Sequence, residues 1–236
     1  MLTRQPLQTF SFSGSAPHHA GLIPYPLLAV VRHGPLHLQQ ADGLVLLYGH
    51  EAVLRLGLYA AADRALAGES VLYLDGANAF DPFVISRLAR VSHVLPRTLL
   101  TSIHLSRAFT CHQMTRLATD HLAQALRTHR ARTVVVSGPF ETFYDEAVPA
   151  GERGKLAQTL VAALRALARR GCRVLCLCPP PPVQQGGVEA LLLPHLCAYA
   201  DRVIAVTDTG DSLALRDEHL RSAKSWHIPR TRWGNI

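Results

Sequence analysis

Short apolar runs and longer stretches with helical spacing alternate along most of the chain. The runs Leu44–Tyr48 and Val71–Asp75 are bounded by turn residues, which is typical of buried strands in a parallel sheet. Between them, Glu51–Ala67 is rich in Ala and Leu and is followed by Gly68, which predicts a helix. Similar patterns predict strands over residues 103–108, 133–137, 173–178, 202–207 and 212–215, and helices over residues 82–91, 111–128, 156–170 and 188–200.

This alternation predicts an α/β core domain with a mostly parallel sheet and helices on both faces, which we place at residues 25–215. Residues 1–24 mix Gln, Ser, Thr, Pro and His without periodicity and predict a flexible N-terminal arm. Residues 216–236 predict a basic and aromatic C-terminal tail. Ligands in such folds bind at the carboxyl ends of the strands, so the first residues to inspect are those after Tyr48, Asp75, Val136 and Cys178.

The amino-acid composition favours a globular protein with a large core. Of the 236 residues, 48% are hydrophobic and 17% are charged, which is enough apolar material for a large core and excludes disorder over most of the chain. No apolar run is long enough to span a membrane, and residues 1–15 lack the apolar segment of a secretory signal. The five cysteines, an odd number, fit a reducing compartment. We therefore expect a cytoplasmic protein, associated with the nucleoid if it binds DNA, and no membrane partner.

The cysteine and histidine spacings do not predict a metal site. Cys172, Cys176 and Cys178 fall on one face of a predicted strand, where small buried thiols act as core residues. The thirteen histidines show no ligand spacing such as His-Glu-x-x-His. We expect no metal.

Three segments resemble the ATPase core of the RecA/RadA-type recombinases. Val71–Pro82, reading VLYLDGANAFDP, is similar to the family's "YIDTEGTFxP", and Leu105–Gln113, reading LSRAFTCHQ, is similar to its "ARAxxxxHQ". Thr133–Ser137, followed by Phe143–Ala147, lies where the family has its Walker B strand. The resemblance spans about residues 40–210 and implies a three-layer RecA-like P-loop NTPase fold with a mostly parallel central sheet.

The nucleotide site departs from the family pattern at each chemical position. A Walker A loop, Gly-x-x-x-x-Gly-Lys-Ser/Thr, needs glycines that let backbone N–H groups wrap phosphates, a lysine and a metal-binding hydroxyl. In the aligned segment Gly49–Leu56 only the first glycine remains. The resemblance also implies that the positions of the family's catalytic glutamate and Walker B aspartate hold non-acidic residues in this chain. The degenerate nucleotide site comprises Gly49, Leu54, Arg55, Leu56, Ala77 and Ser137.

These losses predict a catalytically silent member of the family, with no catalytic residues and neither ATP nor Mg²⁺ as a cofactor. Asp75 and Asp81 remain nearby, and Asp75 is expected to end a strand or cap a turn. The resemblance then implies a non-catalytic accessory protein in DNA repair or recombination, bound to a recombinase-type partner or to itself. The alternative is a DNA-dependent ATPase with unusual ligands, in which Arg55 replaces the lysine and a partner chain supplies the rest.

Nucleic-acid signals concentrate at the C-terminus. In the resembling family DNA lies along loops that map to residues 139–153 and 179–187, but neither is strongly basic here. Basic and aromatic residues together can neutralise phosphates and stack on bases, whereas the alternative is a tail that packs its tryptophans on the domain. Strand addition by Phe10–Ala16 is disfavoured, because its spacing is one residue longer than the family's Phe-x-x-Ala. The candidate DNA-binding residues are Arg221, Lys224, Trp226, Arg230, Arg232 and Trp233.

Overall fold

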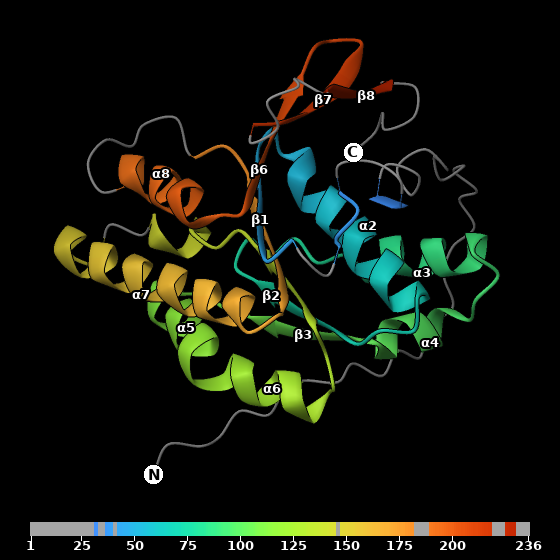
Figure 1. The fold of residues 1–236 in the computed structure, drawn as a ribbon, viewed down its shortest axis with the longest axis horizontal. Coiled ribbons are helices and arrows are strands. Elements are labelled where there is room, and N and C mark those ends of the chain that lie inside the picture. The colour runs from blue at the N-terminus through green and yellow to red at the C-terminus, as the bar shows by residue number, and fades with distance from the viewer. Residues whose placement is uncertain are drawn as a thin grey trace.

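The computed structural model describes residues 31–32, 36–39, 42–144, 147–181, 189–218 and 225–229. Within them the chain forms a three-layer α/β structure, with one sheet between two groups of helices (Figure 1). The predicted arm over residues 1–24 lies outside the described residues. No helix in the described part is both long and apolar enough to cross a membrane.

The sheet contains eight strands among the described residues, in the order β3-β2-β4-β5-β1-β6-β7-β8. The first six strands in the chain pair in parallel, whereas β7 is antiparallel to both of its neighbours. β1 is therefore central, between β5 and β6. The bounds are β1 Leu44–Gly49, β2 Val71–Asp75, β3 Ile103–Arg107, β4 Thr133–Ser137, β5 Arg173–Cys178, β6 Arg202–Asp208, β7 Ser212–Asp217 and β8 Ser225–Pro229.

The two faces of the sheet carry separate hydrophobic cores. On one face, apolar side chains of α2 Ala52–Leu66, α3 Pro82–Val91 and α4 Pro96–Thr101 pack against the strands. The opposite face is covered by α5, α6, α7 and α8, which lie on the left and at the bottom of Figure 1. Their bounds are α5 Cys111–Arg116, α6 Leu122–Thr128, α7 Ala150–Arg169 and α8 Glu189–Tyr199. The mostly parallel α/β architecture expected from the sequence is confirmed.

Most predicted elements are present, and two were missed. The helix predicted over residues 111–128 contains a π-helical turn at Leu117–His121 between α5 and α6. α4 was not predicted, and residues assigned to a tail after position 215 belong to the sheet. Arg216 and Asp217 are the last residues of β7. Ser225–Pro229 forms β8, which pairs with β7 and places the side chains of Trp226 and Ile228 in the core beside α2. β7 thus extends two residues past the predicted boundary at residue 215, and β8 lies within the segment assigned to the tail.

The three cysteines that were predicted to share one face of a strand lie in the core. Cys176 and Cys178 are buried and Cys172 is half-buried, all in the core on the α7 side of the sheet. Burial raises the pKa of the Cys176 thiol to about 12 and that of Cys178 well above its ordinary value. Both thiols therefore stay protonated at neutral pH. No group of three or more His, Cys, Asp or Glu side chains in the described part of the chain is arranged to hold a metal ion.

Candidate functional site

The connection between β1 and α2 is a tight turn of two residues, His50 and Glu51. Gly49, the last residue of β1, has a φ of 111°, and a Cβ atom built on it would lie 2.3 Å from the carbonyl oxygen of Val206 in β6. The N–H of His50 donates to that same oxygen at 2.8 Å. His50 Nδ1 then accepts from the N–H of Ala52 at 3.2 Å and caps the first turn of α2. Gly49 is required because the chain turns directly against β6.

This early start of α2 places the other aligned positions inside the helix. Leu56 is only 2% exposed and belongs to the core, and Leu54 is half-buried against the same core. Arg55 is half-buried, and its Nε atom is buried with no hydrogen-bond partner in the described structure. A phosphate cradle needs a longer loop whose backbone N–H groups face the ligand, whereas here the N–H groups of Val53 and Leu54 donate to the carbonyl oxygens of His50 and Glu51.

Asp75, at the end of β2, organises the turn that follows it. Its side chain is fully buried and accepts hydrogen bonds from the N–H groups of Ala79 and Phe80, each at 3.0 Å. Arg107 Nε, at the end of β3, lies 3.4 Å from the same carboxylate. Asp81 accepts from the N–H of Phe83 at 2.8 Å and caps α3. The expectation that Asp75 holds a turn is confirmed, and Asp81 also has a capping role.

Ala77 and Ser137 are brought side by side by their backbones. The N–H groups of Gly76 and Ala77 both donate to the Ser137 carbonyl oxygen, at 2.8 and 3.2 Å. A Cβ atom on Gly138, whose φ is 57°, would lie 2.6 Å from Ala77 Cβ, and one on Gly76 would lie 2.5 Å from the Gly138 carbonyl oxygen. The space between the β2 and β4 ends is therefore filled by backbone. Gly49 lies on the far side of β5 from this contact.

Ser137 offers a hydroxyl where the family pattern has a carboxylate. The Ser137 Oγ and the Tyr73 hydroxyl are both buried, and neither has a hydrogen-bond partner of ordinary geometry among the described residues. Burial raises the pKa of Tyr73 strongly, although the nearby Ser137 hydroxyl acts in the opposite direction. The phenol therefore stays protonated and neutral at physiological pH. Two neutral hydroxyls do not supply the negative charge that Mg²⁺ prefers.

The segment similar to "ARAxxxxHQ" forms the start of α5. Thr110 Oγ1 accepts from the N–H of Gln113 at 3.2 Å, and Gln113 Oε1 accepts from the N–H of Phe109 at 2.8 Å. These two hydrogen bonds stabilise the first turn of α5, so both side chains have a structural role there. The hydrogen bonds also fix the backbone at Phe109, whose side chain is 70% exposed; Phe83, at the start of α3, is 62% exposed. Phe109 follows the carboxyl end of β3, and Phe83 lies in the first turn of α3, after the turn that follows β2.

Of the candidate DNA-binding residues, only Trp226 is described. It lies in β8, half-buried, with its side chain packed against the core beside α2. Trp226 therefore packs on the domain, which was the alternative to DNA binding. Arg221, Lys224, Arg230, Arg232 and Trp233 lie outside the described residues, and DNA binding by them stays a prediction.

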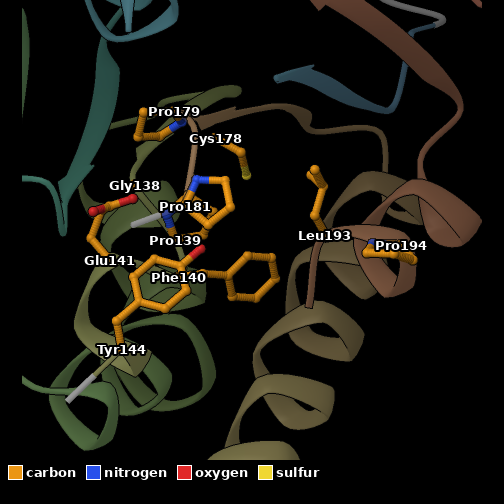
Figure 2. A pocket seen from close by; sticks show the side chains of 10 residues that line it. All are labelled: Gly138, Pro139, Phe140, Glu141, Tyr144, Cys178, Pro179, Pro181, Leu193 and Pro194. Carbon is orange, nitrogen blue, oxygen red and sulfur yellow. The ribbon is translucent and has the colours of Figure 1, made fainter. Parts of the chain in front are cut away.

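A cavity lies at the carboxyl ends of β4 and β5, among the residues after Val136 and Cys178 where the sequence predicted a ligand site (Figure 2). Its volume is about 230 Å³, and it is bounded by the segment Gly138–Tyr144, by Cys178–Pro181 and by α8. Glu141 is the one charged residue among the lining residues that the structure describes, and partial burial raises the pKa of its carboxyl. No local pattern identifies Glu141, because its surroundings come from three separate segments.

Comparison of the chain with protein-family models finds no match, and comparison with curated proteins finds none either. The recombinase resemblance therefore rests on the three sequence segments and on where the fold carries them.

Proposed function

We propose that this chain is a non-catalytic RecA-like accessory protein that acts in DNA repair or recombination through contacts with other proteins. The observation that carries the proposal is the two-residue connection between β1 and α2. It occupies the position at which the resembling family wraps a loop around nucleotide phosphates. Without that loop, and with neutral side chains at Ala77 and Ser137, phosphoryl transfer lacks its main sources of electrostatic stabilisation.

The position of the aligned segments supports the RecA-like part of the proposal. Gly49 ends a central parallel strand and α2 begins after two residues, so the order of strand and helix matches that of a P-loop although the loop itself is missing. The other segments lie on β2, at the β3–α5 connection and on β4. These strands are neighbours in the sheet, so their carboxyl ends meet at one edge.

Exposed aromatic residues at the same edge support a role in protein contacts. Phe83 and Phe109 expose 62% and 70% of their surface, and Arg107, two residues before Phe109, lies 3.4 Å from the Asp75 carboxylate that holds the β2 turn. Aromatic and arginine side chains are enriched at the energetic centres of protein interfaces. A silent copy that keeps this edge can bind a recombinase-type chain or a second copy of itself. We propose weak DNA binding by the C-terminal residues as an addition to these contacts.

Replacing both exposed phenylalanines should weaken this association. We expect the Phe83→Ser, Phe109→Ser double variant to lose at least about tenfold in affinity, because buried aromatic anchors at interfaces contribute roughly 2 kcal/mol or more each. Sedimentation velocity of the protein alone, and binding to a purified recombinase-type ATPase, measure the effect. Leu95→Ser is the matched control, since Leu95 is 75% exposed but precedes α4 at the opposite edge of the sheet. A wild-type chain that stays monomeric and binds no recombinase would contradict the proposal.

A further inference from the structure

The cavity at the ends of β4 and β5 has an apolar interior. Phe140 is 3% exposed and Cys178 is 6% exposed, and in Figure 2 both face the hollow opposite Leu193 of α8. Burial keeps the Cys178 thiol protonated, so the interior carries no charge at neutral pH. An interior of this kind favours an apolar group such as an aromatic ring.

The walls of the cavity offer few hydrogen-bond donors. Four lining residues are prolines, namely Pro139, Pro179, Pro181 and Pro194, and none of these has a backbone N–H. Among the lining residues that the structure describes, none carries a positive charge. The described part of the wall therefore offers few of the donors, and none of the cations, that a phosphate or a carboxylate ligand requires.

Negative charge is found at the rim. Figure 2 shows the Glu141 carboxylate beside Gly138, away from the apolar interior. Glu141 is half-buried, and none of the ion pairs found in the described structure satisfies it. The Tyr144 ring lies next to it along the same wall, and a carboxylate with an aromatic face is a favourable setting for a cation.

We propose that this cavity binds a small aromatic amine, with the ring inside and the ammonium group at the rim against Glu141. The volume of about 230 Å³ is below the roughly 300–1,000 Å³ of sites for drug-sized ligands, so it suits a ligand with a single ring. Charge complementarity decides the class of ligand, since Glu141 is the only charged residue among the described residues that line the cavity and it is acidic. This site is separate from the β1–α2 turn and does not depend on the proposed accessory role.

The test compares 2-phenylethylamine, a cation at pH 8, with the neutral 2-phenylethanol of nearly the same shape. Both are titrated into the full chain while the methyl resonances of Leu193 are followed by NMR. We expect both to shift these resonances, with the amine binding about tenfold more tightly, because a charge-assisted hydrogen bond is stronger than a neutral one. Equal affinities, or no shift of the Leu193 methyl groups, would overturn the proposal.

Variants separate the role of the rim from that of the interior. Glu141→Gln should reduce the preference for the amine to within about twofold while leaving 2-phenylethanol unaffected. Glu152→Gln is the control, because Glu152 is an exposed carboxylate paired with His112 outside the cavity, and it should keep the preference. Acidification should weaken amine binding at a higher pH than an ordinary glutamate would give, since burial raises the pKa of Glu141. A preference that survives in Glu141→Gln would exclude the proposed site.

Discussion

Gly76→Ala should lower the free energy of unfolding by about 2–3 kcal/mol, although it adds a single methyl group. The Cβ atom would lie 2.5 Å from the Gly138 carbonyl oxygen and 2.5 Å from Met114 Cε. The methionine side chain can move aside, but the Gly138 carbonyl is part of the backbone and cannot. The preceding residue, Ser137, holds this backbone in place, because its carbonyl oxygen accepts hydrogen bonds from the N–H groups of Gly76 and Ala77. Relief of the overlap therefore requires the ends of β2 and β4 to separate.

Urea denaturation of the wild type and the variant measures this change. Gly151→Ala is the matched control, because Gly151 lies in the first turn of α7 and an added Cβ atom there meets nothing within 4 Å. That substitution should raise stability by about 0.5–1 kcal/mol, since alanine favours the helix over glycine. If Gly76→Ala is as stable as the wild type, the two strand ends are not in backbone contact and the site is more open than described.

Asp75→Asn should cost about 2–4 kcal/mol, because the carboxylate is fully buried and each oxygen accepts a backbone hydrogen bond. An asparagine amide turns its NH₂ group toward one of these N–H donors, so at least one hydrogen bond is lost. The nearby Arg107 also loses its partner, although its side chain is 37% exposed and water compensates in part.

The same denaturation measurement applied to Asp81→Asn provides the comparison. Asp81 caps α3 through one hydrogen bond to the N–H of Phe83, and asparagine caps a helix about as well as aspartate. We therefore expect a change of less than about 0.5 kcal/mol there. Equal effects of the two substitutions would show that Asp75 has no special role in the turn.

The sequence predicts the buried strands almost to the residue. β2, β4 and β5 are buried along their whole length, so their continuous apolar runs coincide with the strands. β8 was missed because only Trp226 and Ile228 face the core, among Ser225, His227 and Pro229. Two apolar residues are too few to define a period, and the strand depends on pairing with β7. α4 has six residues, which is too short for a helical pattern.

The candidate site is predictable in its chemistry but not in its shape. The resemblance to the recombinase family implies, from the sequence, that a lysine, a hydroxyl and two carboxylates are missing from the aligned positions. The early start of α2 depends on the hydrogen bond from His50 to Val206, which lies more than 150 residues further along the chain. Glu141 and its cavity likewise depend on segments that meet only in the folded protein. Tertiary contacts of this kind leave no local periodicity to detect.

Titration of the protein with MgATP, combined with a phosphate-release assay, tests the central claim most directly. The two-residue turn after β1 has no loop to wrap phosphates, and Ala77 and Ser137 provide no charge for the metal or the attacking water. We predict no saturable binding at about 1 mM ATP and no phosphate release above the blank without protein. Turnover of ATP that Arg55→Ala abolishes would contradict the account, because it would make Arg55 a working substitute for the missing lysine.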